Sequence, residues 1–140
     1  MNLVNMQMDL NSVAVIAGAV SSMVVGMLWY SPIMFAKPWM KLTGMSDSNM
    51  KGTNMGKFMG TMFIISLVES YVLFNFERSF GVIAIHQALQ LVLWAWLGFT
   101  AMTMAANYVA GKKPKNLFLI DASYHLVNLA VMSVVILKLS

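Results

Sequence analysis

The sequence predicts an all-α, polytopic membrane protein with four transmembrane helices and a short interfacial helix after the first. Four apolar segments, each close to or above the ~20 residues needed to cross a bilayer, divide the chain of 140 residues. Hydrophobic residues make up 59% of the chain and charged residues only 10%, which leaves too little polar surface for a soluble globule. The Lys and Arg residues concentrate in two of the three connections between the segments.

The apolar segments must be helical, because the bilayer core contains no water to satisfy backbone N–H and C=O groups. We expect one domain, 1–140, with transmembrane helices at about 12–31, 56–77, 82–110 and 117–138. The third helix is longer than the bilayer is thick, so it should tilt or project on the cytoplasmic side. A tight basic turn then makes the third and fourth helices antiparallel neighbours.

Small residues form a stripe along the first helix, and a second pair opens the second helix. The stripe is Ala14, Gly18, Ser22 and Gly26, and the pair is Gly56 and Gly60. Small side chains at this spacing let another helix approach closely. Contact within one four-helix bundle is the favoured interpretation, and oligomerisation along the stripe is the alternative.

The first helix should end where Trp29 and Tyr30 precede Pro32. Amphipathic aromatic residues are typical of headgroup depth, and proline cannot continue the helical hydrogen-bond ladder. Residues 33–45 then mix apolar side chains, including Trp39, with lysines, a composition suited to a helix lying in the interface plane. We therefore expect Trp29, Tyr30, Pro32 and Trp39 to anchor the chain at the membrane surface.

The lysines predict the orientation of the chain. Lys and Arg are enriched in cytoplasmic loops, so loops 31–57 and 111–116 should be cytoplasmic and both termini outside. The net charge of +4 is explained by this orientation and by anionic lipids, so the expected partner is the lipid bilayer and not a nucleic acid. The chain has no cysteine, which excludes disulfides and thiolate metal sites.

Several polar residues fall inside the predicted helices. Glu69 lies near the middle of the second helix, where an ionisable group costs about 2.5 to 3.5 kcal/mol unless it is partnered or protonated. The third and fourth helices supply His86, Gln90, Asp121, Tyr124, His125 and Asn128. With a rise of 1.5 Å per residue, Glu69, Gln90, His125 and Asn128 lie at similar depths and are expected to share a polar core.

Two interpretations of this polar core remain open. It is either a hydrogen-bonded network that makes helix packing specific, or a path for a proton or solute. A metal centre is disfavoured, because His86 and His125 are about 12 Å apart in depth. The fifteen methionines do not cluster as a ligand set would, so we expect no cofactor. No phosphate-binding loop, nucleophile elbow or zinc-protease motif is present, so we expect no enzyme.

Three sequence blocks resemble a known family. Gly26-x-x-Trp29-Tyr30-Ser31-Pro32-x-x-Phe35, Trp96-x-Gly98-Phe99, and the run from Leu117 to Val127 that contains Asp121, Tyr124 and His125 are similar to blocks of the domain of unknown function 1761. The resemblance implies a four-helix protein of the bacterial inner (plasma) membrane. It implies no activity, substrate or cofactor.

Four short helices rarely enclose a path on their own. We therefore expect a homo-oligomer, not an enzyme, that acts as a transporter or channel for a small solute, an ion or a proton. The alternative is an accessory subunit of a larger membrane complex, which would contribute lipid-facing surface without chemistry.

Overall fold

The structure, a computed structural model, describes residues 11–44 and 54–140. All regular secondary structure in these two ranges is helical, and four helices are long and apolar enough to cross a membrane. The predicted fold class is confirmed. The elements in chain order are α1 (Ser12–Trp29), α2 (Ala36–Thr43), α4 (Met55–Ser79), α5 (Ile85–Ala95), η2 (Trp96–Ala101), α6 (Met102–Ala110) and α7 (Lys115–Leu139).

The third spanning helix is α5, η2 and α6 in continuous succession, and η2 is a π-helical turn inside it. This helix begins at Ile85, three residues later than the sequence suggested. Gly81 adopts a positive φ of 67°, which turns the chain after α4. The Oε1 atom of Gln87 then accepts hydrogen bonds from the backbone N–H groups of Ile83 (2.9 Å) and Ala84 (3.3 Å), so the helix begins only after them.

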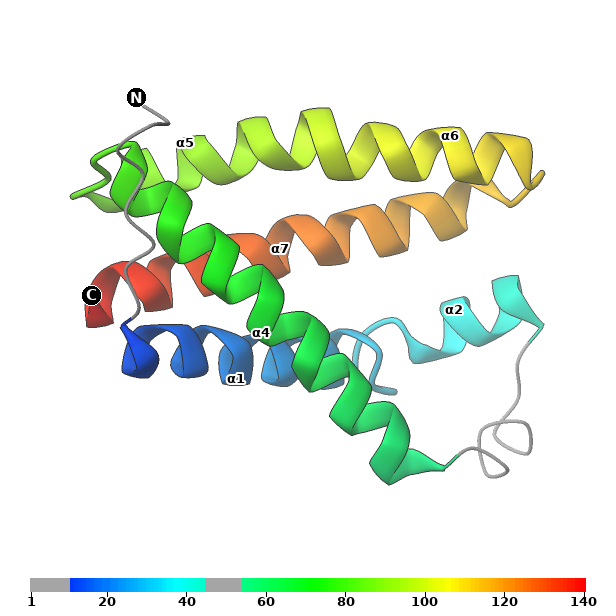
Figure 1. Cartoon of the computed structure of the whole chain (residues 1–140). Helices are drawn as coiled ribbons and strands as arrows, with labels where there is room; N and C mark the ends of the chain where they lie inside the picture. The colour runs from blue at the N-terminus through cyan, green and yellow to red at the C-terminus, as the bar shows by residue number, and fades with distance from the viewer. Residues whose placement is uncertain (1–10, 45–53) are drawn as a thin grey trace.

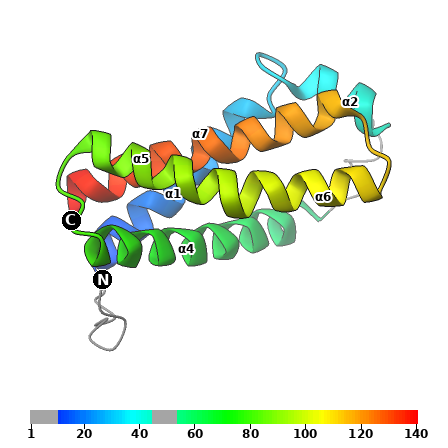
Figure 2. The same cartoon turned by 90° about the horizontal axis from the view of Figure 1, so that it is seen from above.

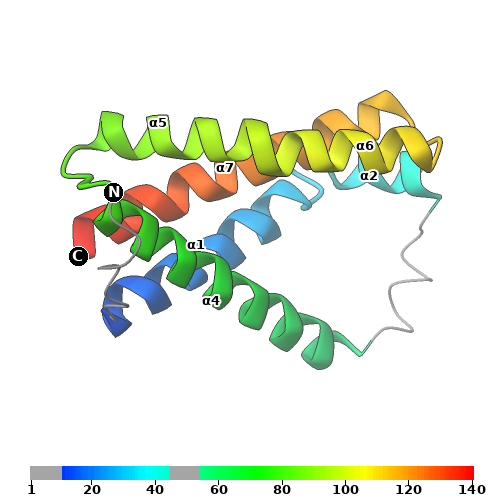
Figure 3. The same cartoon turned by 45° about the horizontal axis from the view of Figure 1, so that its top comes forward.

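α7 is the central element, because α1, α4, α5, η2, α6 and α2 all contact it. α1 packs closely against α7 and α4, and α5 runs alongside α7 (Figures 1 and 2). α4 crosses α1 diagonally, so its first half diverges from the rest of the bundle (Figure 3). The buried residues of α4 accordingly begin only at Ser66.

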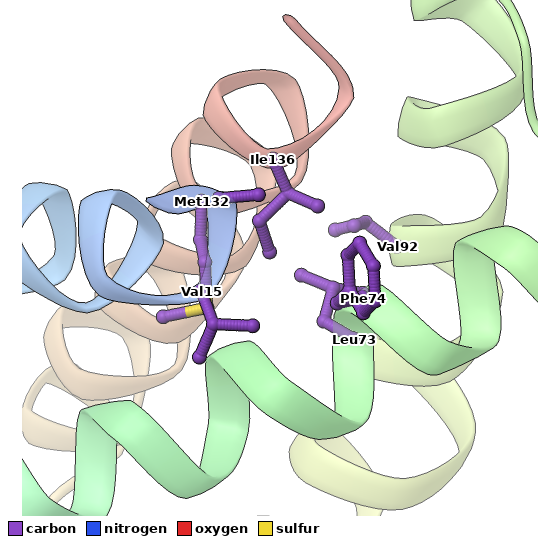
Figure 4. Close-up of a cluster of buried hydrophobic side chains, with 7 residues drawn as sticks. Val15, Leu73, Phe74, Val92, Met132 and Ile136 are labelled. Carbon is purple, nitrogen blue, oxygen red and sulfur yellow. The ribbon is translucent and has the colours of Figure 1, made fainter. Parts of the chain in front are cut away.

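The hydrophobic core lies where α1, α4, α5 and α7 meet (Figure 4). Phe74, Met132 and Ile136 are fully buried there, and Val92 from α5 is 1% exposed. Val15 completes the contact from α1. Asn11, which caps α1 by accepting from the N–H of Ala14, also donates to the carbonyl of Leu139, so the start of α1 is joined to the end of α7.

The small-residue stripe of α1 is buried inside the chain. Ala14, Gly18 and Ser22 are all buried. A Cβ atom at Gly18 would collide with the Ser70 hydroxyl of α4, and one at Gly26 would lie 3.2 Å from the Tyr124 hydroxyl of α7. The stripe therefore packs α1 against α4 and α7, as in the favoured interpretation. The buried residues of the stripe are therefore not themselves exposed for contact between copies of the chain.

Gly56 and Gly60 behave differently, because both are exposed on the diverging half of α4. Within the described residues, a Cβ atom at Gly60 would meet nothing within 4 Å. These two glycines are not part of the contact that buries α1.

Most described lysines lie at one end of the bundle. Exposed lysines occur on α2, at the start of α4 and around the turn between α6 and α7, and Figure 1 places these segments at the same end. The turn between α4 and α5 and the end of α7 lie at the opposite end. The charge asymmetry inferred from loops is thus also an asymmetry in space.

Candidate functional site

A half-buried carboxylate near the lysine-rich end joins three spanning segments. Asp121 of α7 accepts a hydrogen bond from the Tyr30 hydroxyl on Oδ1 (2.7 Å) and one from the Tyr108 hydroxyl on Oδ2 (2.5 Å). Tyr30 directly follows α1, and Tyr108 lies in the last turn of α6. We name Asp121, Tyr30 and Tyr108 the Asp121 clamp. Such bonds are strong because hydroxyl–carboxylate pairs gain from the charge of the acceptor.

Two tryptophans bind the backbone on either side of the carboxylate. The indole Nε1 of Trp29 donates to the carbonyl of Ile120 (3.2 Å), and that of Trp96 donates to the carbonyl of Ala122 (2.8 Å). A helical carbonyl that already accepts one backbone bond keeps a second lone pair for such a donor. α7 is therefore held on both sides of Asp121 by indoles from α1 and η2.

Aromatic rings surround the clamp. Tyr30 contacts Tyr124 and Trp39 edge-on, with ring centroids 5.2 and 5.8 Å apart. Trp39 belongs to α2, so this contact holds the interfacial helix against the bundle. The Nζ atom of Lys113 lies 4.9 Å from the centre of the Tyr108 ring, a cation–π contact.

The environment of Tyr30 keeps its hydroxyl protonated. Burial raises the pKa of Tyr30 above the ordinary value of 10.0, and the hydrogen bond to Asp121 raises it further. Tyr30 is consequently a hydrogen-bond donor at every physiological pH, which suits its place beside a carboxylate.

The residues that carry the three family-like blocks meet at this clamp. Trp29 and Tyr30 come from the first block, Trp96 from the second and Asp121 from the third. Trp29 and Tyr30 were predicted as surface anchors, yet both use their polar atoms to bind α7. Pro32 is exposed in the turn before α2, while Trp39 is half-buried.

A second polar group lies deeper in the bundle, between α1, α4 and α7. The Tyr124 side chain lies near Ser22 of α1 and Glu69 of α4. Ser22 accepts a hydrogen bond from the Ser66 hydroxyl of α4 (3.2 Å). Glu69 is half-buried, and the ring of His125 lies 5.0 Å from that of Tyr124.

Two buried polar side chains each have an oxygen without a hydrogen-bond partner in the described part of the chain. Asn128 is 2% exposed, and within the described residues its Oδ1 atom has no hydrogen-bond partner. Glu77, 3% exposed in the last turn of α4, accepts a hydrogen bond from Ser133 on Oε1, while its buried Oε2 atom has no partner in the described part of the chain.

Not all predicted site residues are brought together. Gln90 and His86 are exposed on α5, on the side away from α7. Both lie about 160° to 200° around the helix from Ala88, which is fully buried against the bundle. Gln90 therefore does not join Glu69, His125 and Asn128, because similar depth does not imply a shared face.

Sequence reasoning missed Glu77 and Tyr108. Glu77 follows Phe74 by three residues and Ser70 by seven, which places it on the buried face of α4. Tyr108 precedes the tight turn that Asp121 follows, so an antiparallel hairpin brings the two close together. Both signals were present in the residue spacing.

A comparison with family models finds one match. The model described as a protein of unknown function (DUF1761) matches residues 13–137, a range that contains α1 to the last turns of α7 and every residue of the clamp. No curated protein and no solved structure gives a significant match to the chain.

Proposed function

We propose that this chain, which belongs to the family of proteins of unknown function DUF1761, moves protons or a small polar solute across a membrane and is not an enzyme. The observation that carries the proposal is the pair of buried oxygens on Asn128 and Glu77 that have no hydrogen-bond partner among the described residues. A network that only stabilises packing satisfies its members, because an unpaired polar atom in hydrocarbon costs several kcal/mol. Open acceptors inside the bilayer are typical of places that water, a proton or a solute visits.

Polar groups follow α7 from one side of the membrane towards the other. Asp121, His125, Asn128 and Ser133 succeed one another along this helix, and Glu77 meets Ser133 from α4. A rise of 1.5 Å per residue separates Asp121 from Asn128 by ~10 Å and Asn128 from Ser133 by ~7.5 Å. One or two water molecules span such gaps, so transient hydration along α7 would connect the carboxyl groups at its two ends.

Flux into proteoliposomes tests the proposal. Purified protein is reconstituted with a pH-sensitive dye inside, and a potassium diffusion potential drives proton entry. We expect protein-dependent acidification that Glu69→Gln, Glu77→Gln and Asn128→Leu each reduce at least tenfold, while the variants remain folded in detergent. Ser70→Ala is the matched control, because Ser70 is a buried residue of α4 whose hydroxyl donates to the Val15 carbonyl.

The alternative outcome is equally informative. If the three variants lose folding in step with activity, or if Ser70→Ala reduces flux as much as they do, the polar groups act in packing. If the wild-type protein transports none of the ions or solutes tested, that result would contradict the transport proposal itself.

One feature supports a second candidate, an accessory subunit of a larger complex. Residues 55–65 of α4 contain no buried side chain, and neither does α6. Both segments therefore offer surface to a partner in the membrane. Stoichiometric co-purification with a larger, different protein after gentle extraction would favour this role.

A further inference from the structure

The third spanning helix carries a polar stripe on its outer side. Ala88, Val92 and Ala101 are buried towards the bundle. The opposite side exposes Gln90, Trp94, Gly98 and Thr103, which we name the outer stripe. In a single protomer the outer stripe faces lipid, although Gln90 and Thr103 are polar.

The π-helical turn limits how far this stripe winds around the helix. Gly98 and Thr103 are five residues apart, a spacing that regular α-helix would rotate by ~140° around the axis. Hydrogen bonds in η2 reach five residues along the chain and absorb the additional residue. Trp96, which donates to α7, and Ala101, which is buried, show the same effect on the inner side although they are also five apart.

Lipid is a poor environment for the outer stripe. Gln90 lies five residues, ~7.5 Å, beyond the start of α5. Its side chain is too short to extend from the hydrocarbon to water at the membrane surface, as a long lysine side chain does. Polar side chains in transmembrane helices almost always face other helices, where their hydrogen bonds contribute about 0.6 to 2 kcal/mol. The stripe is thus suited to contact with a helix from outside the protomer.

We propose that the outer stripe is the contact surface of a parallel homodimer, with a two-fold axis along the membrane normal. Two copies inserted in the same orientation present each residue to its own counterpart at the same depth. The amide of Gln90 both donates and accepts, so it is complementary to itself. A Cβ atom at Gly98 would meet nothing within 4 Å in the described chain, and the missing side chain of Gly98 permits the close approach that such a contact needs.

Disulfide trapping locates the contact, because the natural chain has no cysteine. Single cysteines at Trp94 or Thr103 should form intermolecular disulfides in native membranes under mild oxidation. A cysteine at Ile64 should not, since Ile64 is 62% exposed on α4 but lies outside the stripe. Equal cross-linking at Ile64, or none at Trp94 and Thr103, would overturn the proposal.

Matched glycine variants separate dimerisation from folding. Gly98→Val and Gly60→Val each add a side chain where no described neighbour lies within 4 Å, so neither should disturb the protomer. Gly98→Val should weaken dimerisation at least tenfold in a single-molecule photobleaching assay in vesicles, and Gly60→Val should leave it unchanged. The reverse pattern would move the contact to α4.

The amide of Gln90 provides a further test. Gln90→Leu should weaken dimerisation by about 3- to 30-fold, the range expected for interhelical polar contacts in membranes. Gln90→Asn keeps the amide and should retain most of the affinity. Cross-linking of Thr103→Cys to a different protein in place of a second copy would overturn the homodimer in favour of a heteromeric complex. The dimer does not depend on transport, so loss of either proposal leaves the other intact.

Discussion

The Asp121 carboxylate accepts hydrogen bonds from the hydroxyl groups of Tyr30 and Tyr108, which lie 78 residues apart in the chain. Hydrogen bonds to a charged acceptor contribute more to stability than neutral ones, and removing the acceptor leaves two donors unsatisfied. The clamp therefore acts as a joint between the end of α1, the end of α6 and the start of α7.

The first prediction concerns the energetic coupling of the clamp. Tyr30→Phe and Tyr108→Phe should each lower the free energy of unfolding by about 1 to 3 kcal/mol, because each removes a bond to Asp121. Denaturation in detergent measures the change. Tyr71→Phe is the control, since Tyr71 is half-buried but lies outside the clamp. In an Asp121→Ala background both tyrosine changes should become nearly neutral, and unchanged effects there would contradict the clamp.

The second prediction is a loss of stability at alkaline pH. The folded protein raises the pKa of Tyr30 above 10.0, so the stability that protonated Tyr30 contributes is fully present below pH 10. This stability is lost as the pH rises from 10 towards the pKa of Tyr30 in the folded protein, because unfolding then releases a proton from Tyr30. Unfolding curves between pH 9 and 11.5 should show this slope, and Tyr30→Phe should flatten it. An equal slope of stability against pH in the wild type and in Tyr30→Phe would contradict this prediction.

At the scale of elements, the π turn has a clear geometric role. It lies between α5 and α6. Trp96, its first residue, and Tyr108 of α6 both form hydrogen bonds to α7. An added residue in a regular helix rotates everything after it by ~100°. η2 absorbs that residue locally, so α6 still directs Tyr108 towards Asp121. Sequence periodicity alone treated the whole segment as one regular helix.

The third prediction distinguishes two deletions of one residue. Deleting Phe99, which is 78% exposed within η2, should convert the π turn to α-helix and preserve the faces of α5 and α6. Deleting Ala106 should instead rotate Tyr108 by ~100° away from Asp121. Thermal unfolding should therefore show a small loss for the first deletion and a loss similar to or larger than that of Tyr108→Phe for the second. Equal losses would show that η2 has no such role.

At the scale of the whole molecule, lysines and chain ends define two opposite poles. Exposed lysines gather on α2, the start of α4 and the turn between α6 and α7, whereas α7 ends at the other pole (Figure 1). The positive-inside rule predicts that the lysine-rich pole with the Asp121 clamp is cytoplasmic. This predicted orientation would place Glu77 and Ser133 in the outer half of the membrane.

The fourth prediction tests this orientation. Asn116→Cys and Ser140→Cys introduce single exposed thiols at opposite poles without changing the charge. A membrane-impermeant thiol reagent added to intact cells should label only the cysteine at position 140. The cysteine at position 116 should react only after the membrane is opened. The opposite result would invert the orientation.

The candidate site was only partly predictable. Asp121, Tyr124 and His125 were singled out as polar residues of one helix, and the structure brings Tyr124 near Ser22 and Glu69. Depth could be calculated from helical rise, but depth does not tell which way a side chain points. Gln90 shows the difference, since it was grouped with Glu69 and is exposed on the opposite side of α5.

The sequence by itself determined the four spanning helices, because length and hydropathy are local properties and the bilayer allows no other backbone conformation for such segments. It also determined the asymmetry of charge along the chain. Tertiary structure alone decided which polar groups meet. The Asp121 clamp, the burial of Glu77 against Ser133 and the outward direction of Gln90 all depend on how helices cross and on the one-residue shift at η2. These are relations between distant segments, which no single segment encodes.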